Sequence, residues 1–537
     1  MPPRTPTKWQ QRPGSPAKPG AEKLQALLKR GLRYSSKRQF KEALKYLEKV
    51  LQIEPNESRA LFAKGQLLAE QMYFDRLLFA LSYYDELRCD DPVLYYVVGY
   101  YYFRLKRYEK ALQHLEKAVQ LKPSYVIAQL LIAEIFAEVW NGEDSRRILS
   151  GLTLKTEKIP KETLSHADVL IKLELYEQAL PLLKGLLRHD GMSVQAIRRI
   201  TRLPKEYWPD WLESELEIHL RRSNTSTEDR MYLHFAAGRV LDSQHAFDKA
   251  FYHFEQGNSL SRQDFDADAI HSCVSRLTRI FDNKFEDRRQ PSTNKPVLPV
   301  FIVGLPSAGK TTLEAQLCQH PDIAGAKERD LRMYIGEDIF VGIDGEAPRN
   351  LQSRLLNMSV AKKKQYSQSY IDAVLSSLML QETPKFLLNT LPLNFWNCGV
   401  IKSIFPDARF IHMNRNRMDL CLSNYIRNFN EGYNFSNSFE SLSIYWKLYE
   451  QMSQHWRHCL GDDWLDVSYE LLVSDPTSTI ATVFEFLNLP GEDPATICAE
   501  SSARLTDNYV GRWVNYENHL KPLVEALGVA AGDSEVS

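Results

Sequence analysis

The chain has 537 residues, with 67 Lys or Arg and 68 Asp or Glu, so its formal net charge is -1. Hydrophobic residues make up 44% and charged residues 25%, values typical of a soluble globular protein that is long enough for two or three domains. The balanced charge excludes a global basic field that would attract nucleic acid or a membrane, and no apolar stretch of about 18 residues predicts a membrane span.

The cysteines and the N-terminal segment indicate the compartment. Seven cysteines are scattered along the chain, with no C-x-x-C pair and no His pair at metal-ligand spacing. This pattern favours reduced thiols over a disulfide framework or a zinc site. Residues 1–20 are basic and rich in Pro and Gly, without the apolar core of a signal peptide. We therefore expect a cytoplasmic protein with disordered tails at residues 1–20 and 528–537.

Residues 21–280 contain a repeat with a period of 34 residues. One column holds Gly or Ala, a second lies nine residues later and is aromatic in four of five units, and a third follows three residues further on. This is the period of the tetratricopeptide helix-turn-helix unit, in which small residues let two antiparallel helices approach closely. We predict an α-solenoid of about six or seven repeats. The columns are Gly31, Gly65, Gly99, Ala133 and Ala167; Phe40, Phe74, Tyr108, Gly142 and Tyr176; and Ala43, Leu77, Ala111, Ser145 and Ala179.

The repeat register breaks after residue 190, where Pro204 and Pro209 interrupt the helical pattern, and it returns once at Gly238, Phe247 and Ala250. Repeat arrays of this kind commonly bind a peptide or protein on their concave surface, which is the partner we predict. Packing against the second domain, or dimerisation, is the alternative. The sequence leaves the oligomeric state open.

A phosphate-binding loop follows the polar, Pro-bearing linker at residues 281–296. The apolar run 297–303 predicts a buried strand, GLPSAGKT (residues 304–311) matches G-x-x-x-x-G-K-[ST], and a helix begins near Lys310. Strand, loop and helix in this order aim backbone N–H groups at an anion. KFLLNT and ARFIHMN predict further strands, and NFWNCGVIKSI and DLCLSNYIRNF predict helices. We expect a parallel α/β sheet with helices on both faces.

An ATP- or GTP-using enzyme would also need an Asp at the end of an apolar strand to hold Mg²⁺. The candidate strands end in Asn389 and Asn414, and Asp466 lies inside a short, interrupted run. The loop pattern by itself therefore does not establish a nucleoside triphosphate as the ligand. A P-loop phosphotransferase or NTPase remains an alternative.

Residues 297–527 resemble the tetratricopeptide-linked sulfotransferases and, more distantly, the tyrosylprotein sulfotransferases. The resemblance is carried by VFIVGLPSAGKTTLEAQLCQHPDIAGAKE, LPLNFWNCGVIKSIFPDARFIHMNRNRMDLCLSNYIRNF, VSYELLVSDPTSTIATVFEFLNLP and GRWVNYENHLKPLVEAL. It implies a P-loop-type fold and transfer of a sulfuryl group from 3′-phosphoadenosine-5′-phosphosulfate (PAPS) to a hydroxyl group, releasing 3′,5′-ADP, with no metal ion. Among acceptors it favours a protein tyrosine, while a carbohydrate or small-molecule hydroxyl stays open.

The resemblance also assigns roles to individual residues. Arg415 and Ser423, eight residues apart, fall on positions that clamp the 3′-phosphate, and Glu328 falls on the position of the general base. The loop residues implied to hold the 5′-phosphosulfate are Ser307, Ala308, Gly309, Lys310, Thr311 and Thr312.

Two departures from the family pattern remove positive charge. Relatives carry Arg where this chain has Ser307, and Lys where it has Thr390. Lys310 stands where P-loop enzymes place their β/γ-phosphate lysine, and we predict that it replaces the missing Arg as a catalytic cation. The alternative to an active sulfotransferase is a catalytically impaired repeat protein that binds partners and keeps a vestigial nucleotide pocket.

Overall fold

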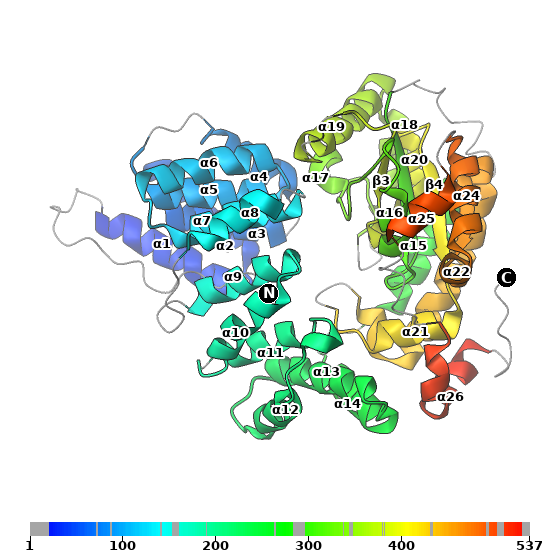
Figure 1. Cartoon of the computed structure of the whole chain (residues 1–537). Coiled ribbons are helices and arrows are strands. Elements are labelled where there is room, and N and C mark those ends of the chain that lie inside the picture. Colours follow the sequence, from blue (N-terminus) through cyan, green and yellow to red (C-terminus); the bar gives the residue numbers. More distant parts are fainter. Residues whose placement is uncertain are drawn as a thin grey trace. The chain divides into compact units, whose positions relative to one another are not determined.

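Figure 1 shows the computed structural model of the chain, with helices through the first half and a sheet in the second. The structure describes residues 21–70, 73–85, 89–139, 142–152, 160–189, 191–261, 265–282, 296–336, 338–342, 347–378, 380, 382–429, 433–489, 493–501 and 510–528. The tail predicted at 1–20, most of the tail at 528–537 and most of the linker lie outside these residues. Two compact units are present, one of Met1–Leu175 with Arg332–Glu337 and the other of Tyr176–Leu331 with Asp338–Ser537.

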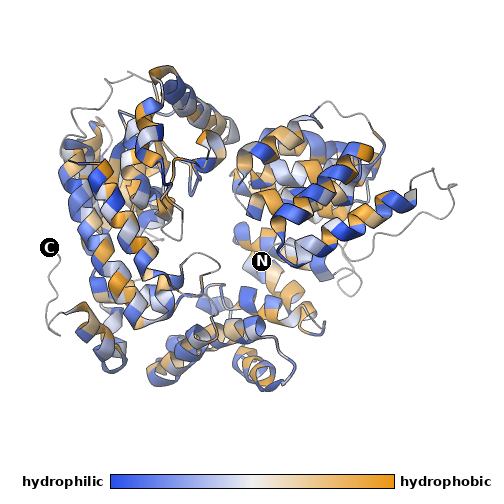
Figure 2. Cartoon of the chain, turned by 180° about the vertical axis from the view of Figure 1, so that it is seen from behind, coloured by the Kyte–Doolittle hydropathy of each residue, from blue (hydrophilic) through white to orange (hydrophobic). Residues whose placement is uncertain are grey.

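Helical hairpins make up the first unit, as the 34-residue period predicts. Figure 2 shows polar and apolar residues side by side on these helices, the pattern of helices with one buried face. The helices are α1 (Ala21–Ser36), α2 (Phe40–Ile53), α3 (Ser58–Glu70), α4 (Phe74–Ser82), α5 (Pro92–Arg104), α6 (Tyr108–Leu121), α7 (Val126–Glu138), α8 (Gly142–Ser150), α9 (Pro160–Lys172) and the short α17 (Arg332–Ile335).

The aromatic column of the sequence marks the first residue of the second helix in each hairpin. Phe40, Phe74 and Tyr108 begin α2, α4 and α6. Two residues before α2 and α6, Arg38 and Lys106 both have φ of 55°, a left-handed conformation that tightens the turn between the two helices. The period therefore fixes both the helix starts and the turns.

The column of small residues lies where the two helices of a hairpin, or adjacent hairpins, approach most closely. A Cβ atom on Gly65 would lie 2.4 Å from a ring carbon of Tyr101, so only glycine fits there. Tyr101 itself is buried, and its hydroxyl donates to the Phe62 carbonyl at 2.5 Å. Among the other tyrosines of α5, Tyr102 is also a core residue, whereas Tyr96 and Tyr100 are half-buried.

The second unit begins with the remaining repeat helices, and the predicted break in register is present. Helix α11 ends at Ile200, and Pro204 precedes a short 3₁₀ turn instead of continuing the helix. The recovered repeat forms one hairpin, with Gly238 on its first helix and Phe247 beginning its second. The elements are α10 (Tyr176–Leu186), α11 (Ser193–Ile200), η1 (Lys205–Tyr207), α12 (Leu212–Arg221), α13 (Thr227–Ser243), α14 (Phe247–Ser259) and α15 (Ala267–Ile280).

A five-stranded parallel sheet organises the rest of the second unit, in the order β2-β3-β1-β4-β5. Strand β1 lies at its centre, where the connections turn to opposite sides, and its last four residues are fully buried. Burial on both faces is expected for a parallel sheet that helices cover on each side. The strands are β1 (Leu298–Val303), β2 (Ile323–Gly325), β3 (Phe386–Asn389), β4 (Arg409–Asn414) and β5 (Trp464–Ser468).

Helices connect these strands, as the alternating pattern predicts. None of the helices within the described ranges is long and apolar enough to cross a membrane. The elements between the strands are α16 (Lys310–Leu317), α18 (Leu351–Asn357), α19 (Val360–Leu378), η3 (Pro392–Asn397), α20 (Cys398–Ile404), α21 (Arg417–Tyr425), η4 (Asn434–Asn437), α22 (Phe439–Leu460) and η5 (Gly461–Asp463). The elements that follow β5 are α23 (Tyr469–Ser474), α24 (Pro476–Leu487), α25 (Pro494–Ser501), η7 (Arg512–Tyr516) and α26 (Glu517–Leu527).

Candidate active site

The carboxyl ends of four neighbouring strands define the candidate site. Gly304 follows β1, Thr390 follows β3, Arg415 follows β4 and Tyr469 follows β5. In open parallel sheets, ligands bind at this edge, in the crevice beside the central strands where the direction of the connections reverses. Residues that are more than 160 positions apart in the sequence therefore meet at one edge.

The loop between β1 and α16 has the backbone shape of an anion cradle. Gly304, Ser307 and Gly309 have φ of 141°, 67° and 98°. A Cβ atom on Gly309 would lie 2.4 Å from the Tyr469 ring, so glycine is required by both φ and space. Left-handed residues in such a turn bring successive N–H groups to one concave side, where the first turn of α16 adds its own.

Lys310 is buried at the start of α16 and lies under the loop. Its Nζ donates to the carbonyls of Gly304 at 2.9 Å and Leu305 at 2.7 Å. Burial lowers the pKa of Lys310 to about 7; the negative charge of Glu328 opposes this shift and the positive charge of Arg427 adds to it. An anion bound in the loop would restore the charged form of this lysine.

Two arginines lie across the same loop. Arg415 Nη1 donates to the Ser307 carbonyl at 2.7 Å, and its guanidinium stacks 4.8 Å from the centre of the Tyr469 ring. Arg427 Nη1 lies 3.3 Å from Ser307 Oγ. The sequence interpretation missed Arg427, which lies two residues beyond the end of α21 and is marked by no local pattern. Arg427 therefore brings a cation to Ser307, where the resemblance expects an arginine.

The remaining predicted site residues lie around this group. Glu328 is exposed after β2, and its charge acts on Lys310 and Glu314. Ser423 is half-buried on α21, the helix that follows Arg415. The other loop positions differ in exposure: Ala308 is buried, Thr312 is half-buried and Thr311 is exposed.

Thr390, where relatives carry Lys, is buried against a carboxyl group instead. Its Oγ1 donates to Glu314 Oε2 at 3.4 Å, and the Lys327 backbone N–H donates to Glu314 Oε1 at 2.9 Å. Burial raises the pKa of Glu314 to about 7, against the lowering effect of these hydrogen bonds. Sequence reasoning gave Glu314 no role.

A buried chain of polar groups supports the loop from below. The Tyr449 hydroxyl accepts from the Leu305 N–H and lies 2.5 Å from His412 Nε2, while His412 Nδ1 lies 2.8 Å from Asp466. Arg457 donates to the same carboxylate at 2.7 Å. Burial lowers the pKa of His412 despite Asp466, so the neutral ring can donate from Nδ1 and accept at Nε2. These hydrogen-bonded side chains hold the start of the loop, at Leu305, in place.

Asp466 is therefore engaged in the middle of β5 rather than at a strand end. His412 and Arg457 hold its pKa well below the usual range, although burial acts to raise it. Of the two strand-end residues, Asn389 donates to the Arg329 carbonyl and the Tyr370 hydroxyl, and Asn414 donates to Asp466 at 3.2 Å. None of these three side chains is placed as the Mg²⁺-binding Asp of a nucleotide hydrolase.

The last repeat hairpin is tied to the site through the C-terminal segment. Asp419 on α21 accepts from the N–H groups of Gly511 at 2.6 Å and Trp513 at 2.9 Å. Between them, Arg512 donates to Asp242 on α13 at 2.5 Å. The helix that follows Arg415 is thus joined to the repeat helices by hydrogen bonds.

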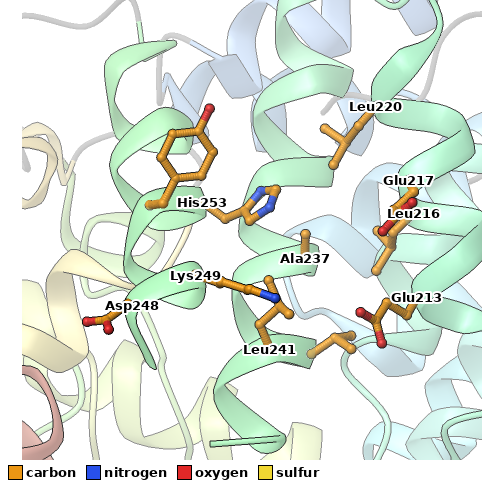
Figure 3. A pocket seen from close by; sticks show the side chains of 11 residues that line it. Glu213, Leu216, Glu217, Leu220, Ala237, Leu241, Asp248, Lys249 and His253 are labelled. Carbon is orange, nitrogen blue, oxygen red and sulfur yellow. The ribbon is translucent and has the colours of Figure 1, made fainter. Parts of the chain in front are cut away.

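A cavity of about 370 Å³ lies on the repeat helices α12, α13 and α14 and not at the loop (Figure 3). Its lining includes the apolar side chains of Leu216, Leu220 and Ala237 and the charged side chains of Glu213 and Lys249. No residue of the loop at 304–311 lines it. It is a feature of the repeat region and is distinct from the candidate active site.

Comparison with protein families agrees with this geometry. The sulfotransferase family model matches residues 299–493, which contain the loop, both arginines and Glu328. This match covers most of the region of the parallel sheet. The model of anaphase-promoting complex, cyclosome, subunit 3 matches residues 36–118, within the tetratricopeptide-like repeats that precede the sheet.

Curated relatives match at low identity. An uncharacterized protein of Aquifex aeolicus is 25% identical over 331 residues, which are 58% of this chain and 43% of that protein. Protein-tyrosine sulfotransferase 1 of Danio rerio is 27% identical over 206 residues, 37% of this chain and 56% of that protein. The Drosophila melanogaster protein-tyrosine sulfotransferase is 25% identical over 243 residues, which are 43% of this chain and 46% of that protein. The chain spans about half the length of these relatives.

Two solved structures are similar to parts of the chain. A tetratricopeptide repeat protein from Parabacteroides merdae has a TM-score of 0.33 at 14% identity, covering 45% of this chain and 95% of that one. Sulfotransferase STF9 from Mycobacterium avium has a TM-score of 0.28 at 14% identity, covering 58% of this chain and 94% of that one. The resemblance to repeat-linked sulfotransferases that the motifs predicted is confirmed by the family comparison.

Proposed function

We propose that this protein transfers a sulfuryl group from PAPS to a hydroxyl acceptor, with a protein tyrosine as the favoured acceptor. One observation carries the proposal: the phosphate loop, Lys310, Arg415, Arg427 and Glu328 converge at the carboxyl edge of the sheet. Transfer of a sulfuryl group from a phosphate to a hydroxyl needs positive charge at the phosphate and a base at the hydroxyl. Three cations and a carboxylate around one anion cradle can supply both.

The residues at this edge suit the donor. The loop N–H groups and Lys310 would hold the 5′-phosphosulfate, while Arg415 with Ser423 would hold the 3′-phosphate. Arg427, close to Ser307 Oγ, adds positive charge that the loop sequence itself lacks. PAPS would supply the sulfuryl group when bound.

The chain's own residues would then act on the proton and on the developing charge. Glu328 would take the proton from the acceptor hydroxyl as its oxygen forms the new bond to sulfur. The bond between sulfur and the phosphate oxygen breaks at the same time, leaving an added negative charge on the released 3′,5′-ADP. Lys310 would stabilise that charge, for which it must be protonated.

The absence of a lysine at Thr390 supports a second candidate, a repeat protein that binds partners with little or no turnover. Thr390 is buried and donates to Glu314, so this side of the site carries a carboxyl group in place of the expected cation. For the phosphotransferase or NTPase alternative no such support exists, because Asp466 is engaged with His412 and Arg457.

The repeats have their own place in the proposal. Tetratricopeptide-like hairpins bury one face against their neighbours and leave an extended concave surface, so we propose that they recruit a protein or peptide substrate or partner. All seven cysteines are free thiols, which supports the proposed cytoplasmic site of action.

A ligand screen separates the three functions. Thermal unfolding of the full chain is measured with PAPS, 3′,5′-ADP, ATP with Mg²⁺, and GTP with Mg²⁺, each at millimolar concentration. We expect PAPS and 3′,5′-ADP to raise Tm and the triphosphates to leave it unchanged, because only a ligand that binds the native state stabilises it. Transfer of radiolabelled sulfate from PAPS to a tyrosine peptide then distinguishes turnover from binding alone. Stabilisation by ATP with Mg²⁺ only would contradict the proposal.

A further inference from the structure

A cluster of arginines extends from the repeat helices toward the phosphate loop. Arg198 and Arg199 lie on α11, and Arg202 lies two residues beyond its end. Arg239 lies on α13, and Arg427 lies two residues beyond the end of α21. Helices α11 and α13 pack against each other within the second unit. Five guanidinium groups are thus drawn from three separate parts of the chain.

Neighbouring groups fix three of these arginines. Arg239 Nη1 donates to the Thr201 carbonyl at 2.9 Å, which places it beside Arg202 in the chain. Arg199 Nη1 donates to Gln195 Oε1 at 2.9 Å, and Arg198 lies 4.0 Å over the Tyr232 ring. Arg202 differs from them. It is exposed, and its side chain makes no hydrogen bond or ion pair with the residues that the structure describes.

The charges that act most strongly on Arg202 are all positive. Arg202 is exposed as a whole, but the groups packed around it partly desolvate its guanidinium and lower its pKa to about 10, and the charges of Arg198, Arg239, Arg199 and Arg427 add to that shift. Like charges gathered in this way destabilise one another and favour a bound anion. The contacts described above give Arg198, Arg199 and Arg239 a structural role, whereas a bound anion would give Arg202 a partner.

Arg427 connects this cluster to the candidate active site. Its Nη1 lies 3.3 Å from Ser307 Oγ. Two buried hydrogen bonds join the repeat hairpin to the same place: Asn258 on α14 donates to the Tyr425 carbonyl at 3.0 Å, and Asn424 donates to the Pro306 carbonyl of the loop at 3.0 Å. The charge of Arg427 acts on both Lys310 and Arg202. The loop itself carries Ser307 where the resemblance expects an arginine, so its positive charge comes from other elements, of which the segment with Arg427 is one.

We propose that Arg202, a residue of the repeat region, is a donor-binding residue whose guanidinium contacts a phosphate group of PAPS and supplies positive charge that the loop lacks. This inference rests on the proposed function and adds to it. The planar guanidinium matches two phosphate oxygens at once, and a lysine at the same position would keep only a point charge. The repeat helices then form part of the donor site as well as a surface for partners.

Calorimetry with 3′,5′-ADP tests the inference without any need for turnover. The full chain is compared with Arg202→Ala, Arg202→Lys and the matched control Arg188→Ala, an exposed arginine beyond α10. We expect Arg202→Ala to weaken binding about tenfold or more, Arg202→Lys to weaken it less, and Arg188→Ala to leave it within twofold. A smaller dependence of binding on salt should accompany the first change, because one charge contact is lost.

The unfolding of the ligand-free variants gives a second readout. Removing one of five like charges should leave the Tm of Arg202→Ala unchanged or higher, while the rise in Tm produced by 3′,5′-ADP becomes smaller. A structural role for Arg202 would lower the ligand-free Tm instead, and that outcome would overturn the proposal. Arg202→Gln, which keeps the length and polarity of the side chain, repeats the test if Arg202→Ala folds poorly.

The outcomes separate this inference from the proposed function. If the unaltered chain fails to bind 3′,5′-ADP, both fall. If it binds, and Arg202→Ala binds as tightly as Arg188→Ala, the donor site stands and the role of Arg202 is wrong. An unchanged affinity with a raised KM for the acceptor would also overturn it, since the cluster would then face the acceptor. With 5′-AMP as a second probe, a loss for 3′,5′-ADP alone assigns the contact to the 3′-phosphate, and an equal loss for both assigns it to the 5′ side.

Discussion

The ends of β1 and β3 both lack a cation that the family resemblance predicts, yet the structure treats the two losses differently. At the end of β1, Lys310 lies under the loop and Arg427 lies beside Ser307. At the end of β3, Thr390 is buried against Glu314, and positive charge is replaced by a carboxyl group with a pKa of about 7. Ser307 is half-buried, so the side chain of Arg427 can reach it from another element. Thr390 is buried, and no cation from another element takes the place of the expected lysine among the contacts described for it.

The first prediction tests the β1 side and should have the largest effect. Lys310→Met keeps the apolar stem and removes the ammonium group, so we expect it to weaken 3′,5′-ADP binding on the order of 100-fold. Calorimetry measures the affinity, and Gln319→Ala, at an exposed position just after α16, serves as the control. Unchanged affinity in Lys310→Met would show that the arginines alone hold the ligand.

The second prediction restores the charge on the β3 side. Thr390→Lys places an ammonium group against Glu314, which becomes its counter-ion, and we expect sulfuryl transfer from PAPS to a tyrosine peptide to rise about tenfold. Turnover is measured by the release of 3′,5′-ADP. In the double variant Thr390→Lys, Glu314→Gln the buried lysine has no counter-ion, so the gain should vanish and the protein should be less stable. A gain that survives in the double variant would refute the pairing with Glu314.

The third prediction uses the pKa of Lys310, about 7 without ligand. A phosphate ligand favours the charged lysine, so binding above pH 7 must be accompanied by uptake of a proton. Affinity for 3′,5′-ADP should therefore fall by up to about tenfold per pH unit above pH 7, until the pKa of the bound state is reached. Calorimetry at pH 8 in buffers of different ionisation enthalpy measures the uptake, which should disappear in Lys310→Met. Proton release instead of uptake would contradict the assignment.

The fourth prediction concerns stability and should be the smallest. The native pKa of Glu314, about 7, lies above its ordinary value of 4.5, so the native state binds more protons than the unfolded state between these values. The cost of the buried carboxylate is absent below about pH 4.5 and complete above about pH 7. Glu314→Gln should raise the free energy of unfolding by about 1 kcal/mol at pH 8 and leave it unchanged at pH 4.5.

Urea unfolding at the two pH values measures this difference, and Glu485→Gln on α24 is the control, an exposed glutamate away from the loop. An equal change at both values would show that the effect of Glu314→Gln comes from packing and not from titration.

Much of the fold could be predicted because its signals are local. The aromatic column at Phe40, Phe74 and Tyr108 predicted helix pairs and also marks where the second helices begin. Likewise, the apolar run before Gly304 predicted β1, and the pattern at Lys310 predicted the start of α16. In each case residues close in sequence determine the structure through helical or strand periodicity. The boundaries of the proposed domains stay a prediction.

The features of the candidate site also fall into two groups, those set by local sequence and those set by contacts between distant residues. The sequence alone determined the loop, the parallel strands and the order of repeats before sheet, since backbone preference and hydrophobic pattern act over a few residues. Only the tertiary structure decided that Arg427 reaches Ser307, 120 positions away, that Thr390 faces Glu314, 76 positions away, and that His412 meets Asp466 across β4 and β5. Such contacts arise from the order of strands in the sheet, and charges brought together there change the pKa of every neighbour. No local pattern records which distant cation comes to lie beside the loop.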